Sequence, residues 1–135
     1  MFFFKVRKKP DFDILIVDDE KDFLDSMEVW FESQGYSVEA VTSGEQALKL
    51  LGEKTPGIIF LDVRMPQMNG IETLKKIRQS NPRIPVVIIT ALATEELRLA
   101  SYKLGVNAFF EKSLDFYKAE HLVNSLVRVV SKRKA

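Results

Sequence analysis

Five short apolar segments alternate along this chain with five longer segments whose apolar residues recur every three or four positions. The short runs are typical of β-strands, and the longer pattern is typical of helices that bury one face. Strands that alternate with helices pair in parallel through right-handed crossovers. The expected strands are residues 11–17, 36–41, 57–61, 85–90 and 107–111, and the expected helices are 21–35, 42–52, 71–81, 94–105 and a last segment around residues 122–130.

Two of the expected strands are only partly apolar, which indicates their place in the sheet. Residues 36–41 contain Ser37 and Glu39, and residues 107–111 end in Glu111. Mixed strands suit the edges of a sheet, whereas fully apolar strands suit its centre. A flavodoxin-like order 2-1-3-4-5 places the second and fifth strands at the edges. We therefore expect an α/β fold, a flavodoxin-like (βα)5 three-layer sandwich. Thr42 with Glu45 is expected to cap the second helix.

Composition narrows the class of protein. The 135 residues suggest one domain, which we place at residues 11–132, with a leader at 1–10 and a basic tail at 133–135. A net charge of +1 gives no reason to expect direct nucleic-acid binding, and the lack of cysteine excludes disulfides and thiolate metal sites. No apolar run approaches the ~18 residues that span a bilayer. The leader is too polar for a signal peptide. We expect a cytoplasmic protein without a membrane segment.

Polar residues follow the strands at the points where the apolar runs stop. The run Gly57–Leu61 ends at Asp62, and the first strand ends at Asp18 and Asp19. In a parallel sheet the carboxyl ends of the strands share one edge, and ligands bind there, where the strand order reverses. The topology therefore predicts that five side chains converge at one edge: Asp18, Asp19, Asp62, Thr90 and Lys112.

Three carboxylates at close range repel one another, so either one of them holds a proton or a cation lies among them. A donor set of oxygen atoms alone favours a hard cation, and Mg²⁺ is the physiological candidate. Lys112 supplies a second positive charge. A carboxylate nucleophile, a divalent metal and an ammonium group are the parts needed to accept a phosphoryl group.

In this order and at these positions, the residues resemble the receiver domain of two-component response regulators. The resemblance runs from about residue 11 to about residue 132 and rests on Asp18-Asp19, Asp62 in DVRMPQMNG, Thr90-Ala91, and Phe109 with Lys112. It implies that Asp62 accepts a phosphoryl group from a sensor histidine kinase or phosphotransfer protein. It further implies that Asp18, Asp19, Asp62 and the backbone carbonyl of Arg64 hold Mg²⁺, Asp18 through water, and that Thr90 and Lys112 contact the phosphoryl group.

The resemblance also implies a switch rather than a conventional enzyme. Phe109 would turn inward when Thr90 moves, which changes the face formed by the fourth helix, the fifth strand and the fifth helix. That face would control a downstream protein or output domain and is a candidate surface for a homodimer. The only catalysis implied is the phosphorylation and dephosphorylation of Asp62 itself. Arg64 and Leu92 would flank the path of the attacking water.

One position departs from the family pattern, which usually has proline after the lysine. Here the residue is Ser113, and a non-proline cis bond costs about 2.5–4 kcal/mol, so we expect a trans Lys112–Ser113 bond. His121 is the single histidine. It is expected on the surface of the last helix, because no strand ends there.

Three other functions compete with this hypothesis. An FMN-binding flavodoxin would need a hydroxyl- or glycine-rich loop after the first strand, and Asp18-Asp19-Glu20 would repel its phosphate. A haloacid dehalogenase-type hydrolase would carry a second aspartate at position 64, which is Arg64 here. The remaining alternative is a receiver-like protein-interaction module that works without phosphorylation.

Overall fold

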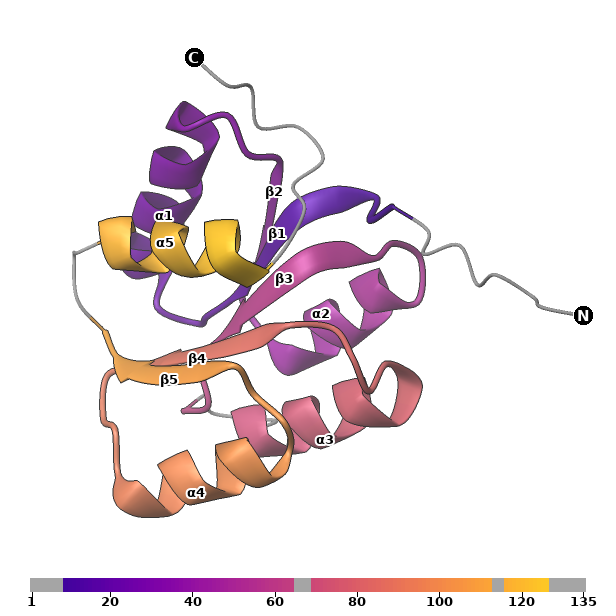
Figure 1. Ribbon diagram of the computed structural model, residues 1–135, viewed down its shortest axis with the longest axis vertical. Helices are drawn as coiled ribbons and strands as arrows, with labels where there is room; N and C mark the ends of the chain where they lie inside the picture. Colours follow the sequence, from indigo (N-terminus) through magenta and orange to yellow (C-terminus); the bar gives the residue numbers. More distant parts are fainter. Residues whose placement is uncertain (1–8, 65–68, 113–115, 127–135) are drawn as a thin grey trace, which may run out of the picture.

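A parallel sheet with helices on both faces forms the molecule (Figure 1). The computed structural model describes residues 9–64, 69–112 and 116–126. The strand order is β2-β1-β3-β4-β5, with all neighbouring pairs parallel, as predicted. The strands are β1 (Phe12–Val17), β2 (Val38–Val41), β3 (Pro56–Leu61), β4 (Val86–Thr90) and β5 (Ala108–Glu111).

Five helices cover this sheet. They are α1 (Lys21–Ser33), α2 (Gly44–Leu51), α3 (Gly70–Ser80), α4 (Glu95–Lys103) and α5 (Phe116–Leu126). Figure 1 shows α1 and α5 on one face and α2, α3 and α4 on the other. The flavodoxin-like three-layer sandwich expected from the sequence is therefore confirmed.

The central strands supply two hydrophobic cores, one on each face. Along β1, Ile14 and Ile16 belong to the core beneath α1 and α5, whereas Leu15 and Val17 belong to the core beneath the other three helices. Each residue of β1 and β4 is buried, whereas β2 and β5 are only partly buried. The mixed strands are thus the edges, as their composition predicted.

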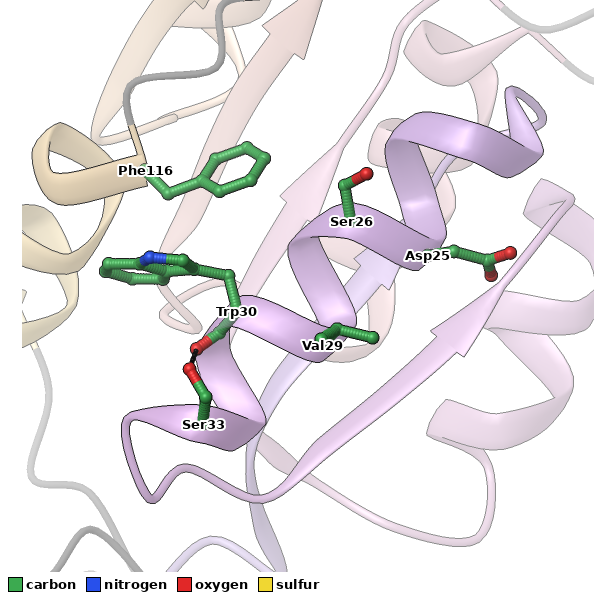
Figure 2. Close-up of a pocket in the computed structure, with 6 residues that line it drawn as sticks. All are labelled: Asp25, Ser26, Val29, Trp30, Ser33 and Phe116. Carbon is green, nitrogen blue, oxygen red and sulfur yellow. Dashed lines mark hydrogen bonds between the residues drawn. The ribbon is translucent and has the colours of Figure 1, made fainter.

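An aromatic cluster holds α5 against α1. The ring centroids of Trp30 and Phe116 lie 5.9 Å apart, and those of Phe23 and Phe116 lie 6.0 Å apart. Figure 2 shows the neighbouring rings of Trp30 and Phe116 in the lining of an open cleft; its lining residues are Asp25, Ser26, Val29, Trp30, Ser33 and Phe116. Trp30 is half-buried between α1 and α5.

The helix ends follow local side-chain chemistry, with one correction. Ser43 caps α2, because its hydroxyl accepts a hydrogen bond from the Gln46 N–H at 3.1 Å. The predicted cap Thr42 instead donates its N–H to Gln46 Oε1 at 2.9 Å, so the helix begins one residue later than expected. Thr94 caps α4, because its hydroxyl accepts a hydrogen bond from the Leu97 N–H at 3.1 Å. Gly105, with φ +75°, follows the end of the same helix in the left-handed region that glycine favours.

Some predictions fall on residues that the structure does not describe. These are most of the leader 1–10, the Lys112–Ser113 peptide bond, the apolar positions 129 and 130 and the tail 133–135. Among the described residues, His121 is exposed on α5 as expected. None of the helices described is both long and apolar enough to cross a membrane.

Candidate functional site

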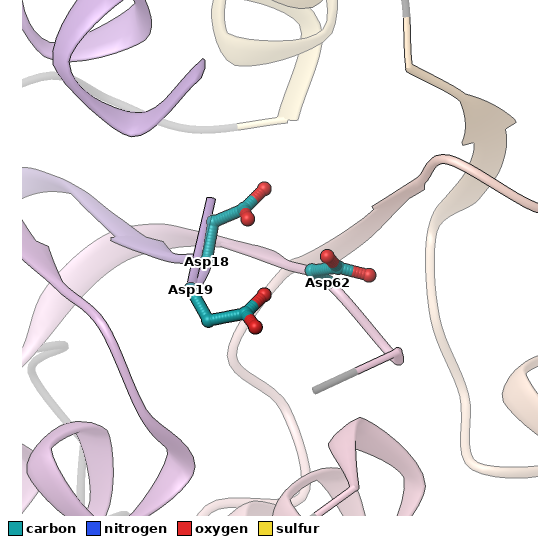
Figure 3. A group of neighbouring side chains, drawn as sticks. All are labelled: Asp18, Asp19 and Asp62. Atoms are coloured by element: carbon teal, nitrogen blue, oxygen red, sulfur yellow. The ribbon is translucent and has the colours of Figure 1, made fainter. Parts of the chain in front are cut away.

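Three aspartates meet at the carboxyl ends of β1 and β3 (Figure 3). One carboxylate oxygen from each of Asp18, Asp19 and Asp62 lies within 4.8 Å of the others. The sheet fixes their backbone, because the Asp18 N–H donates to Val41 O at 3.1 Å and the Asp62 N–H donates to Val17 O at 2.9 Å. Asp18 and Asp62 are buried, while Asp19 is exposed. The predicted convergence of the three acids is confirmed.

Lys112, which follows β5, reaches across to this cluster. Its Nζ lies 2.9 Å from Asp18 Oδ2 and 3.3 Å from Asp62 Oδ2. A third carboxylate, that of Glu20, lies 2.7 Å from the same nitrogen. The Lys112 side chain is only 10% exposed, and its backbone N–H donates to Thr90 O at 2.8 Å. The ammonium group is therefore fixed among three negative charges.

Burial and pairing together set the charges of the site. Burial raises the pKa of Asp18 to about 6, although hydrogen bonds from Lys112 and from the Glu20 N–H oppose that rise. Burial alone would lower the pKa of Lys112, but hydrogen bonds to Glu20 and Asp18 outweigh it, so this pKa is raised. The carboxylate repulsion expected from the sequence is thus countered by the ammonium group and by a greater affinity of Asp18 for a proton.

The remaining residues of the predicted site are Arg64, Thr90 and Phe109. Asp62 Oδ1 accepts a hydrogen bond from the Arg64 N–H at 2.9 Å. Thr90 ends β4 and is fully buried, and its hydroxyl has no hydrogen-bond partner among the residues described. A buried hydroxyl without a partner costs free energy and calls for an explanation, such as a ligand that it contacts. Phe109 pairs with Ile88 and is partly buried against the core beneath α3 and α4.

The ion pair between Glu20 and Lys112 was not predicted from the sequence. Its position directly after the aspartate pair indicated that Glu20 lies near the site. Its contact with Lys112, 92 positions away, depends on the tertiary structure and could not be read from the sequence. The constraint at Gly70 was also missed. A Cβ atom added there would overlap Asp62 O and the Val63 backbone, so this glycine packs directly against the chain that carries Asp62.

Comparison with known proteins decides the family. The model of the response regulator receiver domain matches residues 14–125. The chain belongs to this family. Receiver domains are signalling modules, and this membership assigns the chain to two-component, phosphorelay signalling.

Individual relatives of this receiver domain agree with that assignment. It is 39% identical over 104 residues to the transcriptional regulatory protein ZraR of Escherichia coli K12, covering 77% of this chain and 24% of ZraR. It is 34% identical over 119 residues to the response regulator SaeR of Staphylococcus epidermidis, covering 88% of this chain and 52% of SaeR. The chain thus spans about a quarter and about half of the lengths of these two relatives.

Solved structures show the same fold. A receiver domain protein from Methanospirillum hungatei has a TM-score of 0.78 at 26% identity, covering 84% of this chain and 94% of that one. The response regulator TrrA from Thermotoga maritima, crystallised in complex with Mg(2+)-BeF, has a TM-score of 0.77 at 26% identity. The match covers 85% of this chain and 98% of TrrA.

Proposed function

We propose that this receiver domain accepts a phosphoryl group on Asp62 from the phosphohistidine of a sensor histidine kinase or phosphotransfer protein. One observation carries the proposal: the Lys112 ammonium joins the buried carboxylates of Asp18 and Asp62 at 2.9 and 3.3 Å, within a cluster of three acids. This arrangement offers an oxygen nucleophile beside a fixed positive charge.

The acid cluster fits a Mg²⁺ ion. Its donor atoms are all carboxylate oxygens, which hard cations prefer, and they lie within 4.8 Å of one another. We propose that the ion is held by Asp18, Asp19, Asp62 and the backbone carbonyl of Arg64. When bound, the ion neutralises charge on the phosphoryl oxygens.

The protein's own groups carry out the remaining steps. A carboxylate oxygen of Asp62 attacks phosphorus, and its new bond forms as the phosphorus–nitrogen bond of the phosphohistidine breaks. Lys112 pairs with one phosphoryl oxygen. The Thr90 hydroxyl, buried without a partner among the described residues, donates a hydrogen bond to another.

We further propose that phosphorylation acts through Thr90 and Phe109. Phe109 packs against the same core as Leu97 and Leu104, so a movement of its ring is transmitted to α4. On the outer surface of α4, Leu99 is 51% exposed and Tyr102 is 42% exposed. The face of α4, β5 and α5 is the proposed surface for a downstream protein, an output domain or a second copy of this chain. The cytoplasmic location and the boundaries at residues 11 and 132 stay predictions.

Exposure to acetyl phosphate and Mg²⁺ should add the mass of one phosphoryl group to the intact protein. The Asp62→Asn variant should gain nothing, and the wild type without Mg²⁺ should react far more slowly, because nothing then offsets the clustered negative charge. Glu45→Gln, an exposed acid on α2, serves as the control and should react like the wild type. A folded wild type that keeps its unmodified mass would favour a protein-interaction module that works without phosphorylation.

A further inference from the structure

Glu20 holds the ammonium group that the proposed function needs for phosphate. We propose that Glu20 is an exchangeable partner of Lys112: it binds the ammonium while Asp62 is unphosphorylated, yields it to the incoming phosphoryl group, and so weakens phosphoryl binding. This inference concerns regulation of the proposed site and therefore rests on the proposed function.

The ammonium group of Lys112 already donates hydrogen bonds to Glu20 and Asp18 and forms an ion pair with Asp62. An ammonium group has three N–H donors. Three carboxylates surround it, at 2.7 Å for Glu20 Oε1, 2.9 Å for Asp18 Oδ2 and 3.3 Å for Asp62 Oδ2. A phosphoryl oxygen that pairs with Lys112 therefore competes with these carboxylates for the ammonium group.

Glu20 is the partner that leaves most easily. The Asp18 side chain is 3% exposed and accepts a further hydrogen bond from the Glu20 N–H at 2.8 Å, so it is fixed in place. Asp62 carries the new group itself and stays beside the site. The Glu20 side chain is 59% exposed, so water can solvate its carboxylate after release.

Release of Glu20 requires only a side-chain rotation. Its backbone is held at the start of α1, because its N–H donates to Asp18 and its carbonyl accepts the Leu24 N–H at 3.0 Å. The carboxylate can therefore move without disturbing the helix or the aspartates. Until it moves, the Glu20 carboxylate both pairs with the Lys112 ammonium and repels an incoming anion.

The Glu20→Gln variant isolates this charge. Surface ion pairs contribute about 0.2–1 kcal/mol, which at about 1.4 kcal/mol per tenfold means that removing this competitor should tighten binding of a phosphoryl mimic by about 1.4- to fivefold. The difference between the two proteins should shrink as salt is raised, because salt screens an exposed charge. A purely structural role for Glu20 would not produce that salt dependence.

Calorimetric titration with beryllium fluoride, with each protein saturated in Mg²⁺, measures this difference. We expect tighter binding to Glu20→Gln and unchanged binding to the control Glu45→Gln. Equal or weaker binding to Glu20→Gln at low salt would overturn the inference, because Glu20 would then play no part or would stay on Lys112. A wild type that binds no beryllium fluoride would instead overturn the proposed function itself, and the inference with it.

Discussion

Replacing Gly70 with alanine is expected to lower the free energy of unfolding by about 3 kcal/mol, the upper part of the usual range for overpacking, and to abolish phosphorylation. The added Cβ would overlap Asp62 O and the Val63 Cα, which are backbone atoms and cannot rotate away. Relief therefore requires the start of α3 to separate from the end of β3. That movement displaces the chain that carries Asp62.

Urea unfolding and the intact mass after acetyl phosphate treatment together test this prediction. Gly52→Ala is the matched control, because the nearest atom to its added Cβ is Lys49 O at 3.3 Å, a contact that a small shift relieves. We expect the control to change the free energy of unfolding by less than about 1 kcal/mol. A Gly70→Ala protein as stable and as reactive as the wild type would show that this close packing does not constrain the site.

Replacing Arg78 with alanine should be similarly destabilising but should spare the site. Its guanidinium donates to Leu104 O and Ile84 O, both at 2.7 Å, and to Gly105 O at 2.9 Å. These bonds join α3 to the segments that precede β4 and β5. Hydrogen bonds to charged groups contribute about 1.5–3 kcal/mol each and are not additive, so we expect a loss of about 3 kcal/mol.

Two comparisons make the Arg78 prediction specific. The Arg78→Lys variant should recover little of the lost stability, because lysine lacks the planar guanidinium group that reaches several carbonyls at once. Arg98→Ala removes an exposed pair with Glu95 at 3.1 Å and should cost less than about 0.5 kcal/mol in the same urea titration. Without denaturant, Arg78→Ala should still be phosphorylated. Wild-type stability of Arg78→Ala would contradict the role of this arginine as a link between α3 and the sheet.

Both the fold and the core of the site could be predicted because they depend on strand pattern. Continuous apolar runs marked the central strands, and the parallel topology placed Asp18, Asp62 and Lys112 at one edge before any contact was known. The second helix begins one residue later than predicted. Thr42 and Ser43 are adjacent, and both carry a hydroxyl group that suits an N-terminal cap. Local pattern does not decide between two such neighbours.

The contacts that could not be predicted involve long side chains or close backbone packing. Glu20 and Arg78 reach partners 92 and 26 residues away, and such pairings depend on how the elements pack. The overlap that an alanine at Gly70 would create arises between α3 and the end of β3, so no single segment of sequence reveals it. Glu20 and Gly70 border the predicted site, whereas Arg78 joins α3 to the segments that precede β4 and β5. The strand ends supply the groups of the site themselves.

Borohydride reduction of the phosphorylated protein tests most directly whether Asp62 is the acceptor. An aspartyl phosphate is reduced to homoserine, whereas an ionised carboxylate is not, so proteolytic peptides read by mass spectrometry identify the residue. After treatment with acetyl phosphate and Mg²⁺, we expect homoserine at position 62 and unchanged Asp18 and Asp19. Homoserine at another position, or an unreduced Asp62 in protein that has gained phosphate, would contradict the assignment.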